Sequence, residues 1–354
     1  MRWIDEAPWG LVARQGPTFV SYFFVLSGFV LAVAYPALDD PVERRRFWRA
    51  RFARIYPLYL LALGLVIALQ LPAQDVSPIA AAGQASLLQG FVPQWIPTLN
   101  YPGWSISVEA FFYAIFPWLI GWLSARRSIV TMLVAVGVLW LVAQTLYSLF
   151  LSVEAAGRLS PAGGLFLRYN PVLFVGSFAW GIAAALVMRK LGAWIGARPW
   201  IGRWGADLAL IALIATLVAA MLLLPSLSRA MALPVSSDGG LFAPLFALSI
   251  MALAIDESRL ARTLSWRPLV VLGEASYGVY ILQVPVWIVF MIAIRPKLDV
   301  GTTGAFFIFV AILTLVSVAV LYAFEKPARA WLRGTRSAAL RRPTRPPGNA
   351  AARP

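Results

Sequence analysis

Long apolar runs alternate with short polar segments along nearly the whole chain. Each of the longest runs approaches the roughly 20 residues that an α-helix needs to cross a bilayer. The pattern predicts nine membrane-spanning helices, near 18–35, 55–71, 104–123, 128–150, 171–188, 206–224, 241–255, 276–294 and 303–324. The seventh run is short, and we expect it to tilt or to thin the bilayer locally. The pattern therefore indicates an all-α polytopic membrane protein.

Composition agrees with this class. The 354 residues are 60% hydrophobic and 13% charged, whereas a soluble domain is about half apolar and about a quarter charged. The net charge of +15 does not indicate nucleic-acid binding, because the charges cluster between apolar runs. There are no cysteines, which excludes disulfides and zinc–thiolate sites, and no histidines, which removes the usual general base near neutral pH.

The basic residues predict how the chain crosses the membrane. The connector between the first two runs carries six arginines and no lysine: Arg44, Arg45, Arg46, Arg49, Arg51 and Arg54. With this connector inside, 23 of the 30 Lys and Arg residues lie on the cytosolic side, as the positive-inside rule requires. We therefore expect the N-terminus outside and the C-terminus in the cytosol. Because Arg also binds phosphates in a planar fork, the connector is either a topology signal that contacts lipid headgroups or a ligand site.

Two polar segments stand outside the predicted spans. Residues 333–354 are rich in Arg, Pro and Ala, which predicts a disordered basic cytosolic tail after a single transmembrane domain at 1–332. The segment 72–103 combines prolines and side-chain amides with Trp95 and Tyr101. It is interpreted as a stiff loop with its aromatic rings at headgroup depth. The alternative is a surface for a hydroxyl-rich acceptor such as a sugar.

A carboxylate inside a span is costly, which makes it a candidate functional group. Glu109 lies in the third run, and Ser105, Glu109 and Tyr113 are spaced by four residues, so they share one helical face. This row offers a hydroxyl, a carboxylate and a phenol for chemistry within the membrane. In the alternative, structural interpretation, Glu109 is favoured near a helix N-terminus that Ser105 caps.

A second polar face occurs in the eighth run. Ser276, Tyr280 and Gln283 fall on one side of a helix, where they either bind a substrate or form hydrogen bonds between helices. Two carboxylates lie at helix ends. Glu274 is either solvated or functional, and Glu325 either simply ends the last helix or is a buried partner of the arginines.

Five short motifs resemble those of the membrane-bound acyltransferase family 3, the O-antigen and exopolysaccharide O-acetyltransferase type. They are FFVLSGFVL at 23–31, RARFARIYPLY at 49–59, GWSISVE at 103–109, GEASYGVYILQ at 273–283 and FEKPAR at 324–329. The motifs occur in the family's order and extend over nearly the whole chain. Each motif alone is weak evidence, whereas five in order are strong.

The resemblance implies a ten-helix fold with an arginine-rich cytosolic loop. It also implies an enzyme that moves an acetyl or other short acyl group from cytosolic acyl-CoA to a hydroxyl of a polysaccharide, a lipid-linked glycan or a small acceptor. Such a protein is expected in the bacterial inner membrane, with acyl-CoA as donor substrate and without a bound cofactor or metal.

The resemblance and the polar faces together give the candidate site residues. Arg51, Arg54 and Arg49 are expected to bind the donor phosphates, because Arg pairs well with phosphate. Glu109 is the candidate catalytic residue. The acceptor is expected to contact Trp104, Ser105, Ser276, Tyr280 and Gln283.

The chain departs from the family pattern in one respect. In the family, the first helix carries an Arg and then a His thought to act as the base, whereas this chain has no histidine and its first run matches the family's second helix. The simplest interpretation is that residues upstream of Met1 are missing from the predicted gene, so that 1–17 is an external loop. The other is an inactive relative that serves as a scaffold. A transporter or flippase of a polar or lipid-linked substrate is the rival from another class.

Overall fold

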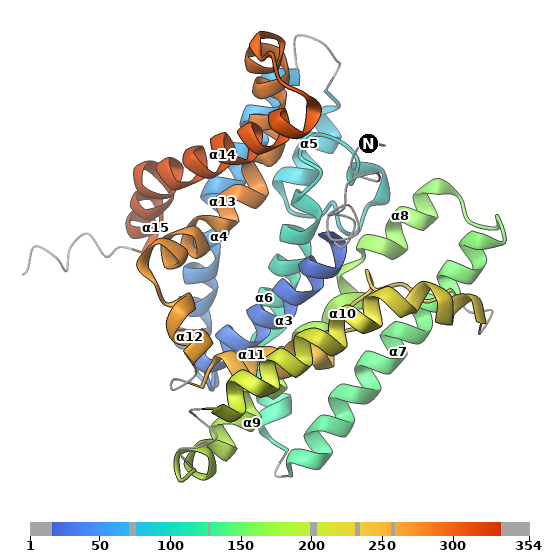
Figure 1. Cartoon of the computed structure of the whole chain (residues 1–354), viewed down its shortest axis with the longest axis vertical. Helices are drawn as coiled ribbons and strands as arrows, with labels where there is room; N and C mark the ends of the chain where they lie inside the picture. The colour runs from blue at the N-terminus through green and yellow to red at the C-terminus, as the bar shows by residue number, and fades with distance from the viewer. Residues whose placement is uncertain are drawn as a thin grey trace, which may run out of the picture.

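Helices make up nearly all the regular structure in the computed structural model of the chain (Figure 1). It describes residues 16–70, 76–126, 128–198, 204–230, 234–255 and 259–333. This part of the chain contains no β-strand, which confirms the predicted all-α class. The segment predicted as an external loop at 1–17 and the basic tail fall almost entirely outside the described residues.

The long helices are α3 (Gly16–Ala34), α4 (Pro41–Gln70), α6 (Gly103–Ser124), α7 (Ile129–Ala155), α9 (Val175–Gly196), α10 (Ala206–Ala230), α13 (Arg267–Val289) and α14 (Thr302–Val320). The shorter ones are α5 (Pro78–Ala85), α8 (Pro161–Tyr169), α11 (Ala243–Leu253), α12 (Arg259–Leu264) and α15 (Lys326–Arg333). Single turns of 3-10 helix occur at η1 (Pro93–Trp95), η2 (Pro171–Phe174) and η5 (Arg295–Lys297), and π-helical turns at η4 (Phe290–Ile294) and η6 (Leu321–Glu325).

Among the described residues, eight of the nine predicted spans form helices long and apolar enough to cross a membrane. The seventh run, already the shortest in the pattern, forms α11, which has only 11 residues. At 1.5 Å per residue it is about 16 Å long, about half the thickness of the hydrocarbon core. α11 packs instead against α3, α9 and α10, so it is a helix of the bundle interior.

The arginine connector is helical, which corrects the expectation of a loop. α4 runs without a break from Pro41 to Gln70 and contains both the arginines and the second apolar run. Pro41 occupies the first helical position, where its fixed φ is favourable and its missing N–H costs nothing. The residues that follow are mostly good helix formers, so the helix begins well before the apolar run does.

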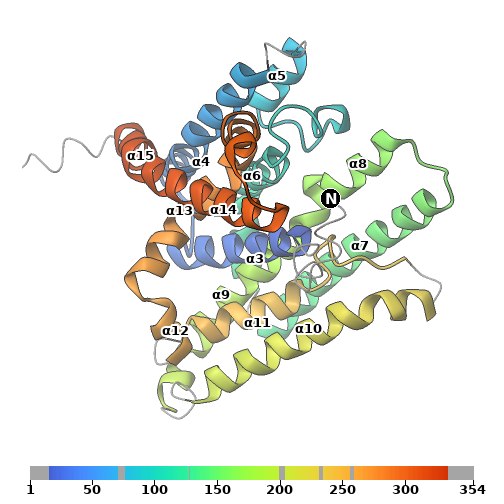
Figure 2. The same ribbon diagram turned by 45° about the horizontal axis from the view of Figure 1, so that its top comes forward.

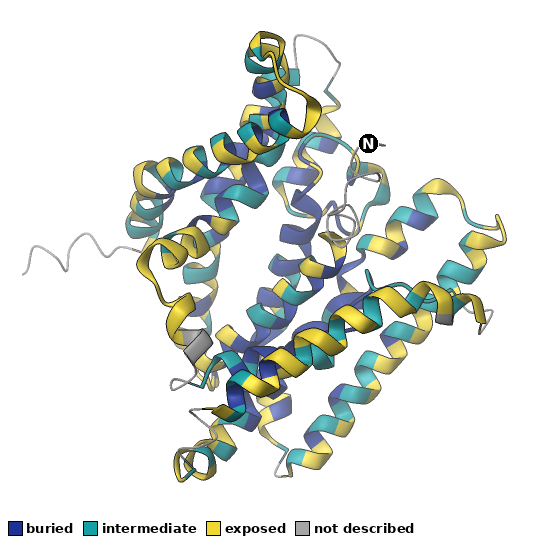
Figure 3. Ribbon diagram, in the orientation of Figure 1, coloured by how far each residue is buried: buried dark blue, intermediate teal, exposed yellow. Residues whose placement is uncertain are grey.

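α3 lies at the centre of the bundle. It packs most extensively against α9, with α7 and α10 on one outer side and α4, α13 and α14 on the other (Figures 1 and 2). Buried residues concentrate on α3, α6 and α9, whereas α10 exposes most of its surface (Figure 3). Most polar side chains of α3 and α6 therefore face protein; the buried ones are Thr18 and Ser21 of α3 and Ser105, Ser107 and Glu109 of α6.

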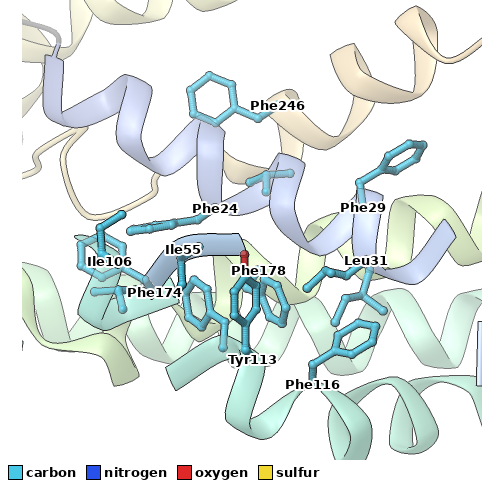
Figure 4. Packing of buried hydrophobic residues seen from close by; sticks show 14 of the residues in the cluster. Phe24, Phe29, Leu31, Ile55, Ile106, Tyr113, Phe116, Phe174, Phe178 and Phe246 are labelled. Carbon is cyan, nitrogen blue, oxygen red and sulfur yellow. The ribbon is translucent and has the colours of Figure 1, made fainter. Parts of the chain in front are cut away.

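A cluster of aromatic rings fixes α6 against α3 and α9 (Figure 4). Phe24 of α3 meets Phe112 and Phe174 edge to face, each with ring centroids 5.2 Å apart. Phe112 also stacks on Phe178 at 4.5 Å. These rings are fully or almost fully buried, and such pairs contribute specific geometry in addition to apolar burial. The cluster therefore sets the position of α6, which carries the candidate carboxylate.

Two glycines allow α3 and α9 to approach each other closely. A Cβ atom on Gly28 would lie 2.2 Å from the carbonyl oxygen of Phe178, and one on Gly181 would lie 1.9 Å from that of Val25. Real Cβ atoms essentially never come within 3.0 Å of such atoms. The glycine of the SGF motif is therefore needed for contact between the two backbones.

The segment 76–102 folds onto the ends of the helices through buried amides. Gln84 Nε2 donates to the carbonyl oxygen of Thr98 at 2.5 Å, and Gln89 Nε2 donates to Tyr59 Oη at 3.0 Å and to the carbonyl oxygen of Gly103 at 2.6 Å. Both glutamines are buried, so their amides hold the segment in place and do not face an acceptor. The segment also contains the short helix α5 and the 3-10 turn η1, which the expectation of a stiff loop had not included.

Candidate functional site

The residues predicted to carry function gather at two levels, which α3 connects. The first turns of α3 line a cavity, and Tyr35, directly after the helix, contacts Arg51. Val20 and Tyr35 are separated by a rise of about 22 Å at 1.5 Å per residue. The cavity and the arginines thus lie toward opposite ends of α3.

Arg51 packs its guanidinium among aromatic rings. Its carbon Cζ lies 5.4 Å from the ring centroid of Tyr35 and 6.0 Å from that of Phe47, and Nη2 donates to Tyr35 Oη at 3.4 Å. The Nε atom is buried without a hydrogen-bond partner among the described residues. The rings orient a guanidinium whose donor capacity is only partly used.

Arg54 and Arg49 differ in their surroundings. Arg54 is half-buried and lies within electrostatic range of both Glu109 and Glu325. Arg49 is exposed and donates from Nε to the carbonyl oxygen of Leu332 at 2.8 Å. Of the three arginines predicted to bind the donor, Arg51 and Arg54 therefore face the buried carboxylates, whereas Arg49 lies at the rim and fastens α15 to α4.

Glu109 lies between the arginines and the cavity. Its side chain is buried, and Oε1 accepts hydrogen bonds from Tyr113 Oη and, at 3.3 Å, from Ser27 Oγ. The charges of Arg51 and Arg54 act on it from the side of α4. A buried carboxylate persists only with such partners. Glu109 and Tyr113 share one face of α6 as predicted; the hydrogen bond between them, and the one from Ser27 of the SGF motif, come from the structure.

Ser105 does not cap α6, which corrects the structural interpretation of the row. The helix begins at Gly103, and the residue at its N-cap position, Pro102, forms no side-chain hydrogen bond to the first turn. Ser105 Oγ instead donates to Tyr280 Oη at 2.8 Å, and the carbonyl oxygen of Pro102, at 3.2 Å, is the alternative acceptor for its single proton. It is thereby aimed at α13.

A cavity of about 530 Å³ opens beside this hydrogen bond. All five residues predicted to contact the acceptor line it: Trp104, Ser105, Ser276, Tyr280 and Gln283. Its further lining comprises Gly16, Pro17, Phe19, Val20, Phe23, Tyr101, Pro102, Ile106, Tyr169 and Tyr277. The structure thus brings together polar residues of α6 and α13 that lie about 175 positions apart in the sequence.

The wall of the cavity combines aromatic faces with hydroxyl groups. The hydroxyls of Tyr101 and Tyr169 are 2.5 Å apart, and the Trp104 and Tyr169 rings lie 4.7 Å apart. Burial and the contact with Tyr169 raise the pKa of the Tyr101 hydroxyl above its ordinary value of 10.0. Tyr101 therefore remains a neutral hydrogen-bond donor and acceptor at physiological pH.

The carboxylates near the ends of the last two spans behave differently. Glu274 is exposed and forms an ion pair with Lys326 at 2.8 Å. Glu325 is buried and pairs with Arg329, with Arg54 also in electrostatic range. Glu325 is therefore buried, but its ion-pair partner is Arg329 of α15, and of the arginine connector only the charge of Arg54 acts on it among the described residues.

Three residues that line the cavity or form hydrogen bonds in the candidate site were not predicted from the sequence. Ser27 and Tyr277 lay within family-like motifs without an assigned role, and Tyr169 gave no signal because aromatic residues are common in membrane proteins. Tyr277 lines the cavity and donates from its hydroxyl to the carbonyl oxygen of Ile55 at 2.6 Å, joining α13 to α4. Among the described residues, no group of three or more His, Cys, Asp or Glu side chains could hold a metal ion.

Comparison with known proteins bears on these features. A protein of Streptomyces mycarofaciens named acyltransferase MdmB is 32% identical over 208 residues, which cover 52% of this chain and 50% of that protein. Protein 2 in picA locus of Rhizobium radiobacter is 36% identical over 119 residues, covering 27% and 62%, respectively. The chain thus spans between about half and two thirds of the length of these curated relatives. No solved structure matches it.

The profile of one protein family covers almost the entire chain. It is described as an acyltransferase domain and matches residues 3–324, a range that contains the arginines of α4, Glu109 and the cavity. The sequence motifs had implied the same family. The chain belongs to acyltransferase family 3.

Proposed function

We propose that this multi-pass membrane protein transfers a short acyl group from acyl-CoA to a hydroxyl group of an acceptor bound in the cavity. The proposal rests mainly on one observation. Glu109 is buried on α6 one turn from Ser105, which lines the cavity of hydroxyls and aromatic rings, and lies within electrostatic range of two guanidinium groups of α4. Family membership supports acyl transfer in general; the donor, the acceptor and the bacterial inner membrane are our inference.

Arg51 and Arg54 bind the phosphates of the donor in this proposal. Both project from the basic half of α4, where a guanidinium can form two parallel hydrogen bonds to a phosphate. Arg51 is held by Tyr35 and Phe47 yet retains a donor without a partner among the described residues. Arg49 contributes at the rim, through its charge. The basic half of α4 faces the cytosol, where acyl-CoA is available.

Glu109 acts as the proton acceptor. The acceptor hydroxyl oxygen attacks the thioester carbonyl, so that an oxygen–carbon bond forms and the carbon–sulfur bond breaks. The hydroxyl proton passes to the Glu109 carboxylate and then to the leaving sulfur, which departs as the CoA thiol. Tyr113 and Ser27, which donate to Glu109, hold its oxygens in position for this transfer.

The acceptor binds in the cavity. Trp104 and Tyr280 offer ring faces, and Ser105, Ser276 and Gln283 offer polar groups. Flat rings beside hydroxyls suit a ring-shaped polyol such as a sugar, whose apolar face stacks while its edges form hydrogen bonds. We therefore assign the acceptor to the class of glycans, lipid-linked glycans or glycosylated small molecules.

Binding of acetyl-CoA to the purified protein, measured by calorimetry, tests the donor site. We expect the double variant Arg51→Ala/Arg54→Ala to weaken binding at least about tenfold, because each charge-assisted hydrogen bond is worth about 1.5–3 kcal/mol. Arg45→Ala/Arg46→Ala is the matched control, since it removes the same charge from exposed positions of the same helix. Equal affinities of the two double variants would contradict the assignment.

A further inference from the structure

We propose that Arg329, in the last helix, is a third guanidinium that binds the phosphate group of the donor together with Arg51 and Arg54. The inference deepens the proposed donor site and rests on it. It follows from the position of α15, from the burial of Arg329 and from the charge balance of the cluster around Arg54.

α15 lies against the basic half of α4 (Figures 1 and 2). The hydrogen bond from Arg49 to the carbonyl oxygen of Leu332 ties the two helices together. The ion pair between Glu274 and Lys326 ties the start of α15 to α13. The last helix is thus fixed on two sides, and Arg329 lies between these ties on the same short helix.

Arg329 is buried to an extent that an ordinary surface arginine is not. Its side chain is 20% exposed and its Nη2 donates to Glu325, while its Nε is buried without a partner among the described residues. Arg54 lies close enough for the two positive charges to repel. Bringing two guanidinium groups together away from water is costly unless an anion compensates them.

The cluster has more positive than negative charge. The cluster of Arg51, Arg54 and Arg329 is within electrostatic range of two buried carboxylates, Glu109 and Glu325, among the described residues. The exposed Glu274 is also within range of Arg54 and Arg329, but its ion pair with Lys326 already compensates its charge. One positive charge remains uncompensated in this part of the chain, and Nε of both Arg51 and Arg329 lacks a partner there. A phosphate, which offers several oxygen acceptors and a negative charge, satisfies both deficits.

The same chemistry could come from the phosphate of acyl-CoA or from that of an anionic lipid headgroup. We assign the site to the donor, because its guanidinium groups are half-buried between helices and two of them, those of Arg51 and Arg54, act on Glu109, the proposed proton acceptor. A headgroup would instead contact the exposed arginines of α4, such as Arg45 and Arg46. The last helix, which packs against α4, then forms one wall of the donor site.

The test compares the affinity for CoA of full-length variants in nanodiscs of zwitterionic lipid. Arg329→Gln is expected to weaken CoA binding about tenfold, the loss typical of one charge-assisted hydrogen bond. Arg333→Gln is the matched control, since it removes the same charge one turn further along α15 from an exposed position; it should change affinity less than about twofold.

A second variant distinguishes a direct loss of CoA binding from a loss caused by unfolding. Arg329→Gln leaves Glu325 buried without its partner, whereas Glu325→Gln/Arg329→Gln leaves no unpaired charge at this position. If the double variant unfolds at the wild-type temperature and still loses about tenfold in CoA affinity, the assignment of Arg329 holds. A folded double variant that binds CoA as tightly as the wild type overturns it.

The outcomes also separate this inference from the proposed function. Wild-type CoA affinity in Arg329→Gln, with loss in Arg51→Ala/Arg54→Ala, overturns the role of Arg329 alone. Wild-type affinity in both variants overturns the donor site as a whole. If Arg329→Gln leaves CoA binding intact but abolishes binding of phosphatidylglycerol vesicles, the site belongs to lipid and the donor assignment fails.

Discussion

Replacing Gly28 by alanine should separate α3 from α9 and so disturb the carboxylate at the centre of the bundle. The new Cβ atom would lie 2.2 Å from the carbonyl oxygen of Phe178, whereas ordinary contact begins at 3.4 Å. Backbone, not a flexible side chain, blocks the space. The two helices must therefore move apart by about 1 Å, because interiors packed to crystal-like density do not absorb such an overlap.

The cost can be worked out from two contributions. Overpacking of this kind typically destabilises by about 1–3 kcal/mol. Ser27 precedes Gly28 and donates to Glu109 at 3.3 Å, so a shift of about 1 Å also removes that hydrogen bond, at about a further 1–3 kcal/mol. At about 2–4 °C per kcal/mol, the melting temperature should fall by about 5 °C or more.

The assay is thermal unfolding in detergent, followed by circular dichroism, with Gly64→Ala as the matched control. Gly64 lies within α4, and a Cβ atom added to it would have nothing within 4 Å. Alanine there should be neutral or stabilising by about 0.5–1 kcal/mol, because glycine is a poor helix residue. Equal melting temperatures for Gly28→Ala and Gly64→Ala would refute the reasoning.

The facing helix offers an independent check of the same contact. Gly181→Ala places its Cβ atom 1.9 Å from the carbonyl oxygen of Val25, so it should destabilise by a similar amount. Because both substitutions separate the same two helices, their effects should not add. A double variant that loses the full sum of the two single losses would mean that the helices do not move as rigid units.

Three further predictions concern single polar groups. Glu109→Gln should abolish acyl transfer while changing acetyl-CoA affinity less than about threefold, because the amide cannot accept the proton; retained turnover in a transfer assay would exclude Glu109 as the proton acceptor. Gln89→Leu should destabilise by about 1–3 kcal/mol in a melting assay, since it removes the donor to Tyr59 and Gly103. Burial raises the pKa of Asp238 above 3.8, so stability should fall as pH rises from this value through the folded pKa, and Asp238→Asn should flatten that slope in melting curves measured against pH.

The lengths of the apolar runs were sufficient for eight of the nine predicted spans among the described residues, but not for the helix boundaries. A run of apolar residues marks where a chain can meet lipid, yet α4 extends 14 residues before its predicted start at 55 because Arg, Glu, Phe and Ala also form helix. The same limit affects 241–255, where the apolar run predicts a span although only α11 forms. Hydropathy reports the surroundings of a helix, whereas propensity and capping decide its ends.

The candidate site was partly predictable because membrane burial makes polar residues conspicuous. Glu109 and the face of Ser276, Tyr280 and Gln283 could be found on that ground alone. Their convergence on one cavity could not, because it depends on how α6 and α13 pack. The partnership between Ser27 and Glu109 also requires tertiary structure, since the two residues are 82 positions apart.

The polar row on α6 explains how one helix can serve both levels of the site. Ser105, Glu109 and Tyr113 rise by about 6 Å per step on one face, so the row extends from the cavity toward the arginines of α4. Two of its members bond different neighbours: Ser105 bonds Tyr280, and Glu109 bonds Ser27. A substitution that rotates α6 would therefore disturb both levels together, whereas one confined to the arginines would affect only the donor level. The orientation of α6 is therefore expected to affect both donor binding at the arginines and acceptor binding in the cavity. If this is so, replacing Arg51 and Arg54 should weaken donor binding and leave the affinity for the acceptor unchanged.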